Sequence, residues 1–156
     1  MTRNWILGIV AGLLLTACDQ TYPFTKSMDR ARTAPDTWIE CTRDFDIEGG
    51  WDRMYVIPGP IGDDWVVKDI VGAPIELTIP DGSRCVVYIR DGKVVEYSIV
   101  DNSIDWPKSL AIEWWYSQAP GYSEECVLPS DTISVRMLTD LPYETYRYEV
   151  KRATSR

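Results

Sequence analysis

The chain has 156 residues, enough for one domain with a hydrophobic core, and carries 24 acidic and 16 basic residues, a formal net charge of −8, and no histidine. Because Ser/His/Asp triads, Cys/His dyads, HExxH zinc sites and facial-triad iron sites all require an imidazole, this composition excludes most familiar hydrolase mechanisms. The negative charge argues against contact with nucleic-acid phosphates, so no nucleic-acid partner is expected.

The N-terminal residues have the organisation of an export signal. One basic residue, Arg3, precedes an apolar stretch from Trp5 to Leu15, which is about half the length of a membrane-spanning helix. The stretch ends in Leu15-Thr16-Ala17-Cys18, which resembles the lipobox of bacterial lipoproteins. That resemblance implies removal of residues 1–17, acylation of Cys18 and attachment of the mature chain to a membrane by its acyl chains. The alternative is an ordinary secretory signal with an incidental cysteine.

The residues after Cys18 bear on where such a lipoprotein is retained. In enteric-type bacteria, an aspartate directly after the lipidated cysteine tends to keep a lipoprotein in the inner membrane, and here Asp19 and Gln20 follow. The resemblance therefore implies a periplasm-facing envelope protein, with the inner membrane favoured over the outer membrane. Cleavage would also remove Arg3, the one charged residue of the leader, and change the net charge from −8 to −9.

Residues 18–36 are expected to be the lipidated N-terminus and a tether. They contain two prolines and several turn-forming residues, and they show no sustained hydrophobic period. The alternative is an ordered arm in which Tyr22 and Phe24 dock on the folded domain. The exported domain is then predicted to cover residues 37–156.

Beyond Trp38 the main pattern is alternation of apolar and polar residues, which predicts strands with one buried face. Strands are predicted within residues 44–48, 51–57, 65–71, 75–79, 84–90, 94–100, 107–116, 132–137 and 145–150. Asp91-Gly92 predicts a two-residue hairpin between two of these runs. Residues 107–116 are ambiguous, because Pro107 also suits the first turn of a helix. The predicted fold class is all-β, a small antiparallel β-sandwich or barrel of about eight strands.

Three cysteines remain after Cys18, and an exported compartment permits one disulfide among them. Cys41 and Cys85 both fall on apolar faces of predicted strands, which favours a bond between these two across the core. Cys126 would then be buried alone or pair with another chain.

The acidic residues show no clear catalytic or metal-binding pattern. Asp44-x-Asp46-x-Glu48-Gly49 resembles the opening of an EF-hand calcium loop, but Tyr55 stands where the last bidentate carboxylate is needed, so no metal site is predicted. No phosphate-binding loop, dinucleotide fingerprint, nucleophile elbow or CxxC pair occurs. Carboxylate-only glycan hydrolysis stays open chemically, although spacing singles out no pair. We expect a protein without catalytic residues or cofactor.

The candidate partner-binding residues are Trp106, Trp114, Trp115 and Tyr116. Trp114 and Trp115 cannot both face one core if they belong to a strand, so at least one ring would be exposed or covered by a loop. An exposed tryptophan can stack on a sugar ring or anchor a protein interface. The predicted function is therefore a membrane-anchored module that binds an envelope protein or glycan. The alternatives are an acidic inhibitor of a cationic wall-active enzyme, similar to lysozyme inhibitors, and a carboxylate-based glycan hydrolase.

Overall fold

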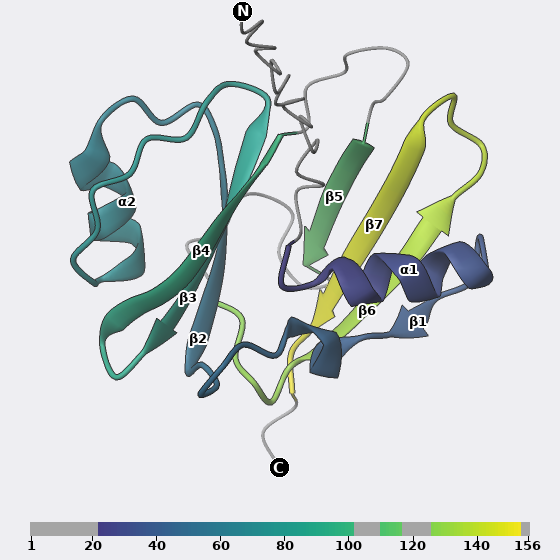
Figure 1. Cartoon of the computed structure of the whole chain (residues 1–156), viewed down its shortest axis with the longest axis horizontal. Coiled ribbons are helices and arrows are strands. Elements are labelled where there is room, and N and C mark those ends of the chain that lie inside the picture. The colour runs from purple at the N-terminus through teal and green to yellow at the C-terminus, as the bar shows by residue number, and fades with distance from the viewer. Residues whose placement is uncertain (1–21, 102–109, 117–125, 154–156) are drawn as a thin grey trace, which may run out of the picture.

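The computed structural model describes residues 22–101, 110–116 and 126–153, which form two β-sheets and two α-helices (Figure 1). Sheet A has the strand order β1 (Ile39–Glu40), β6 (Thr132–Leu138), β7 (Glu144–Lys151), β5 (Leu110–Tyr116). Sheet B has the order β2 (Arg53–Pro58), β3 (Ser83–Arg90), β4 (Lys93–Asp101). The helices are α1 (Thr25–Thr33), α2 (Asp64–Val71) and the short 3-10 helix η1 (Thr42–Phe45). The predicted all-β, sandwich-like class is confirmed. No helix of the described residues is long and apolar enough to span a membrane.

The hairpin predicted at Asp91-Gly92 joins β3 to β4. Both residues have positive φ angles, 52° and 70°, as a two-residue type I′ turn requires. The backbone N–H of Asp91 donates a hydrogen bond of 2.6 Å to Oδ2 of Asp52, which fastens the turn to the segment before β2. This local prediction is confirmed.

Three predicted strands are wrong. Residues 65–71 form α2, because Val67, Ile70 and Val71 also fit the three- and four-residue spacing of one helix face, and Gly72 ends the helix with a φ of 64°. Residues 44–48 begin within η1, although Phe45 and Ile47 are buried as expected. Residues 75–79 make only one isolated bridge, between Ile61 and Ile79.

Strand β5 resolves the ambiguity of residues 107–116 in favour of a strand. It lies parallel to β7, with Leu110 paired with Glu144 and Tyr116 paired with Val150, whereas the other strand pairs are antiparallel. A parallel pair requires a long connection between its strands, and β6 lies within that connection. Sheet A is therefore mixed, which the turn pattern of the sequence did not indicate.

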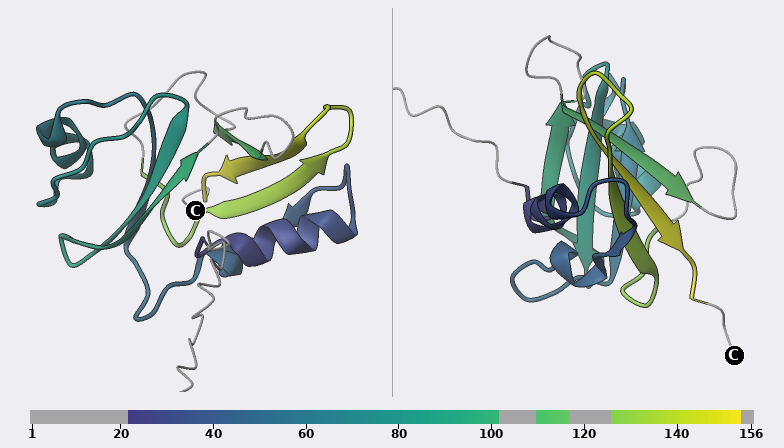
Figure 2. Two further views of the ribbon diagram at one scale, coloured as in Figure 1. Left: turned by 45° about the horizontal axis from the view of Figure 1, so that its top comes forward. Right: turned by 90° about the vertical axis from the view of Figure 1, so that its right-hand side faces the viewer.

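The hydrophobic core has two parts, one on each face of sheet B. Val86 and Tyr88 of β3 belong to the part that sheet A and α1 share, whereas Cys85, Val87 and Ile89 belong to the part beneath α2. Figure 2 shows α1 along sheet A and α2 on the far side of sheet B. Strand β3 is thus buried on both faces, which explains its nearly continuous apolar run.

Residues 22–36 are an ordered part of the domain, so the prediction of a tether is wrong there and the alternative of an ordered arm is confirmed. Tyr22 and Phe24 are buried, and their rings stack with centroids 5.3 Å apart. Phe24 also stacks on Phe45 at 5.4 Å and meets the edge of Tyr148 at 6.0 Å. The folded domain therefore begins well before residue 37.

We predict that Phe24→Ala lowers the free energy of unfolding by about 3–5 kcal/mol, because it leaves a cavity between α1 and sheet A. Urea-induced unfolding of the purified chain measures this loss. The control is Tyr97→Ala, whose side chain is 51% exposed on β4 and whose loss should change stability by no more than about 0.5 kcal/mol. Equal losses in the two variants would show that the arm does not stabilise the domain.

Candidate functional site

The predicted aromatic group lies at one edge of sheet A. The register of β5 places Trp114 beside Tyr148 and Trp115 beside Glu149, whereas Trp106 lies outside the described residues. Within the described part of the chain, β5 pairs with β7 on one side and with no strand on the other. A strand in that position offers backbone donors and acceptors to another chain.

An ion pair fixes the register between β5 and β7. Nε and Nη2 of Arg147 each lie 2.8 Å from Oε2 of Glu113, and both side chains are partly buried. Partial burial weakens the screening of this pair by solvent and salt. The pair therefore holds the middle of β5, next to Trp114 and Trp115, against the rest of sheet A.

A cationic and aromatic row crosses the same face of sheet A. Arg136 of β6 is directly opposite Arg147 of β7 in the antiparallel register, an arrangement that destabilises a sheet unless each charge has a partner. Arg147 has Glu113, and the guanidinium carbon of Arg136 lies 4.9 Å from the centroid of the Trp38 ring. We call these four side chains, Trp38, Arg136, Arg147 and Glu113, the outer row.

The outer row offers two kinds of contact to a partner, aromatic stacking and hydrogen-bond donors. Trp38 is 40% exposed despite its contact with Arg136, so one part of the indole is available for stacking. The guanidinium group of Arg136 supplies hydrogen-bond donors, and the row continues along β5 toward the position of Trp115. The sequence pattern did not indicate Trp38 and Arg136 as site residues, because their contact joins residues almost a hundred positions apart. The alternation of β6, which places Arg136 on the polar face, was the only available signal.

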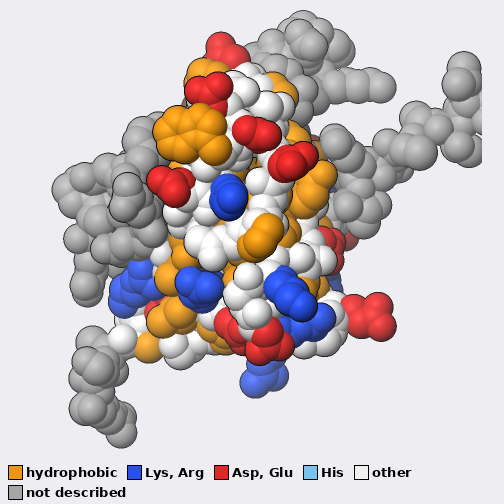
Figure 3. Space-filling view, turned by 90° about the vertical axis from the view of Figure 1, so that its left-hand side faces the viewer, with side chains coloured by type: hydrophobic (Ala, Val, Ile, Leu, Met, Phe, Trp, Pro, Cys, Tyr) orange, Lys and Arg blue, Asp and Glu red, His pale blue; other side chains and the backbone are white. Residues whose placement is uncertain are grey.

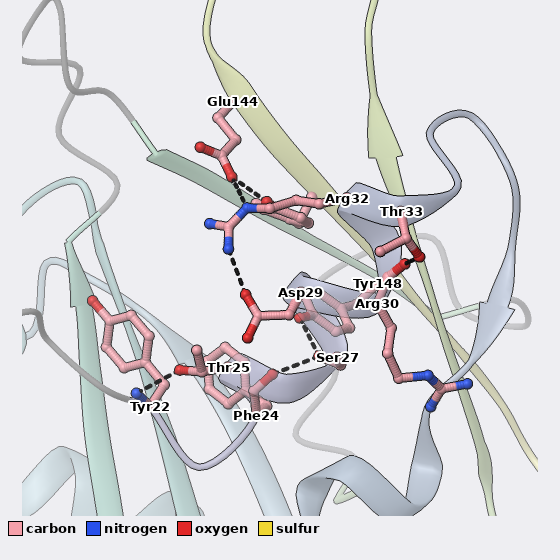
Figure 4. A network of polar contacts seen from close by, with 11 residues as sticks. Tyr22, Phe24, Thr25, Ser27, Asp29, Arg30, Arg32, Thr33, Glu144 and Tyr148 are labelled. Atoms are coloured by element: carbon pink, nitrogen blue, oxygen red, sulfur yellow. Dashed lines mark hydrogen bonds and ion pairs between the residues drawn. The ribbon is translucent and has the colours of Figure 1, made fainter.

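A second polar cluster lies where α1 meets the start of β7 (Figure 4). Arg32 donates hydrogen bonds to Glu144 at 2.7 Å and to Asp29 at 2.5 Å, and Tyr146 also donates one to Glu144. Nearby, Ser27 Oγ and Tyr148 Oη share a hydrogen bond of 2.7 Å. These contacts fasten α1 to sheet A, so we assign the cluster a structural role.

This environment shifts the pKa values of Glu144 and Tyr146. Partial burial by itself raises the pKa of Glu144, but the hydrogen bonds from Tyr146 and Arg32 and the charge of Arg32 outweigh it, so the pKa lies below the ordinary value. Burial, followed by the hydrogen bond to Glu144, raises the pKa of Tyr146 well above its ordinary value. Both groups therefore hold their usual charge states at neutral pH.

The two buried carboxylates of the described chain have arginine partners. Asp44 lies 2.6 Å from Arg30 of α1, and Asp131 lies 2.8 Å from Arg152 after β7. Asp131 also accepts hydrogen bonds from the backbone N–H groups of residues 128 and 153. Both aspartates thus fasten chain segments together. In the described ranges, no group of three or more acidic or cysteine side chains is placed to hold a metal ion.

The expected disulfide between Cys41 and Cys85 is wrong, and Cys41, Cys85 and Cys126 are all free thiols. Cys41 belongs to the core shared by the two sheets, whereas Cys85 faces the opposite side of sheet B, beneath α2. Burial raises the pKa of both thiols to about 12, which keeps them protonated. Cys126 is half-buried beside Tyr55.

The lipidation residue Cys18 and the sorting residues Asp19 and Gln20 lie outside the described residues. Comparison of the chain with protein-family models, curated proteins and solved structures finds no match. The assignment of a function therefore depends on the residues themselves.

We predict that Glu144→Gln destabilises the chain more at neutral pH than in acid. The folded-state pKa lies below the unfolded value of about 4.3, so the ionised carboxylate contributes stability above about pH 5 and loses it as the pH falls through the folded-state pKa. Because Glu144 is 39% exposed, the difference should stay below about 1 kcal/mol. Urea unfolding of the unchanged chain and of Glu144→Gln at several values between about pH 3 and pH 7 measures how this difference in unfolding free energy depends on pH. Glu76→Gln, at an exposed position, is the control, and a pH-independent difference for Glu144→Gln would contradict the prediction.

Proposed function

We propose that this chain is a lipoprotein of the bacterial cell envelope, anchored through Cys18, whose domain acts by binding a protein or glycan partner. The anchor is supported by the lipobox-like run Leu15-Thr16-Ala17-Cys18 and by the charged and apolar segments before it. The binding role is supported by one observation above the others, the exposed Trp38 ring in a row of charged side chains that leads to β5.

The chemistry of the outer row suits such a partner. An indole face stacks on sugar rings and also anchors protein interfaces, and arginine donors give either contact its orientation. Trp115 is two positions along β5 from Glu113, so among the aromatic residues of this strand it is the one whose position continues the outer row. The backbone of β5 adds further donors and acceptors at the sheet edge.

The ordered position of Tyr22 limits how far the domain can stand from the membrane. Four residues lead from Cys18 to Tyr22, so a fully extended chain spans about 14 Å at most. The N-terminal end of α1 would then lie nearest the membrane. Helix α1 packs on one face of sheet A through Tyr148, and the outer row lies on the opposite face. The anchor would leave the outer row accessible.

We predict that Cys18→Ser releases the protein from membrane fractions or leaves an unprocessed precursor, because the sulfur of this cysteine would carry the diacylglycerol through a thioether. Fractionation of cells and intact mass spectrometry of the product measure both effects. Cys126→Ser is the matched control, since it changes a domain thiol and should remain membrane-bound. A membrane-bound product of normal mature mass from Cys18→Ser would show that the anchor is assigned to the wrong residue.

We predict that Trp38→Ala and Trp115→Ala each reduce capture of the native partner by about tenfold, since a buried aromatic anchor contributes at least about 1.4 kcal/mol to an interface. Crosslinking in the native envelope, followed by purification of the chain and quantification of what accompanies it, measures capture. Tyr97→Ala, on the other sheet, is the control and should capture as much as the unchanged chain. Unchanged capture by both tryptophan variants would overturn the proposed binding surface.

A further inference from the structure

The segment between β2 and β3, residues 59–82, packs on the outer face of sheet B and contains α2; we call it the α2 lobe. Val67 and Val71 of α2 are fully buried against sheet B, and they are the buried residues of this helix. Trp65 lies in the first turn and is 61% exposed, more than any other large apolar side chain described. An indole in this position contributes little to the core and exposes apolar area to water.

The surface around Trp65 is strongly acidic. The lobe contains five carboxylates and one basic residue, all exposed, namely Asp63, Asp64, Lys68, Asp69, Glu76 and Asp81. None of the five carboxylates forms an ion pair with another described residue. Figure 3 shows the side of the molecule that carries α2, where acidic and apolar side chains lie together above a more basic lower half.

Helix stability explains only some of the charges on α2. Asp63 is the N-cap residue, yet its side chain makes no capping hydrogen bond. Asp69 lies in the last turn, where a negative charge opposes the helix dipole. It is also four positions from Trp65, so the two share one side of the helix. Asp63 and Asp64, at the N-terminal end, have the sign that the dipole favours, whereas Asp69 does not. All three carboxylates are exposed and form no ion pair with another described residue, so they are available to a partner.

We propose that the exposed face of α2 is a docking surface for a cationic protein segment, with Trp65 as the anchor and Asp63, Asp64 and Asp69 as the partners of lysine or arginine. A central aromatic residue surrounded by charges is the arrangement of an interface hot spot, and the charges attract and orient a basic partner. An anionic membrane would be repelled by the same carboxylates. A neutral sugar would use the indole and leave three like charges uncompensated.

This surface is independent of the outer row, because the two lie on different sheets. Either can fail experimentally without the other. The docking surface also accords with the net charge of the chain, which draws basic proteins toward it before any contact forms.

The test uses a random peptide library displayed on phage and selected on the full-length chain. We expect the enriched peptides to be net cationic and to contain an apolar residue that covers the indole. Enrichment of neutral or acidic peptides, or of none, would overturn the proposal. Because the library contains all charge states, the selection decides the class of partner without any assumption about its identity.

The affinity of an enriched peptide for variants then locates the site. Trp65→Ala should weaken binding by about tenfold. The triple variant Asp63→Asn, Asp64→Asn and Asp69→Asn should weaken it and remove most of its dependence on salt between about 50 and 500 mM. Binding that either variant leaves unchanged would overturn the proposal.

Matched controls separate a local from a general effect. Asp46→Asn, Glu48→Gln and Glu96→Gln together change the net charge by the same amount at exposed positions outside the α2 lobe, and should preserve affinity. Equal losses in both triple variants would show attraction to overall charge and no docking site. Urea unfolding of Trp65→Ala should stay within about 0.5 kcal/mol of the unchanged chain, since the side chain is mostly exposed.

Discussion

The packing of Phe24 between Tyr22 and Phe45, with the edge of Tyr148 against it, is the contact on which the rest of the structure depends. It places α1 on sheet A and closes the core that the two sheets share. Aromatic side chains bury about 150–250 Å² each, so a few of them provide much of the apolar burial that a domain of this size requires. The hydrogen bond between Ser27 and Tyr148 then satisfies a phenol that would otherwise be costly to bury.

Helix α1 also shows why local sequence could not predict this part of the fold. Its buried residues, Ser27, Met28 and Ala31, lie at helical spacing, but only Met28 is a large apolar residue, and the residues that dock the helix, Tyr22 and Phe24, precede it. Tertiary contact therefore decides its structure. The β3–β4 hairpin is the opposite case, because the turn residues Asp91 and Gly92 specify it locally. Helix α2 is an intermediate case, since the spacing of Val67 and Val71 fits both the period of a strand and the period of a helix.

The same distinction applies to the candidate site. The sequence indicated the tryptophan residues of β5 and their place in a strand, because alternation is local. It could not place Arg136 against Trp38, or Cys41 and Cys85 on opposite sides of sheet B, because both results depend on which strands are neighbours and which face each residue takes. A shift of one residue reverses that face. The exposure of Trp65 was not predicted, because residues 65–71 were expected to form a strand and instead belong to α2.

The positions of the two proposed surfaces follow from how α1 and α2 cover the sheets. Helix α1 covers the inner face of sheet A and begins near the proposed anchor, so the face of that sheet with Trp38 and Arg136 lies on the side away from the helix. Helix α2 covers the outer face of sheet B and thereby places Trp65 on the far side of that sheet. Because the two rings lie beyond different sheets, one domain can engage a basic segment at α2 while a second partner occupies sheet A.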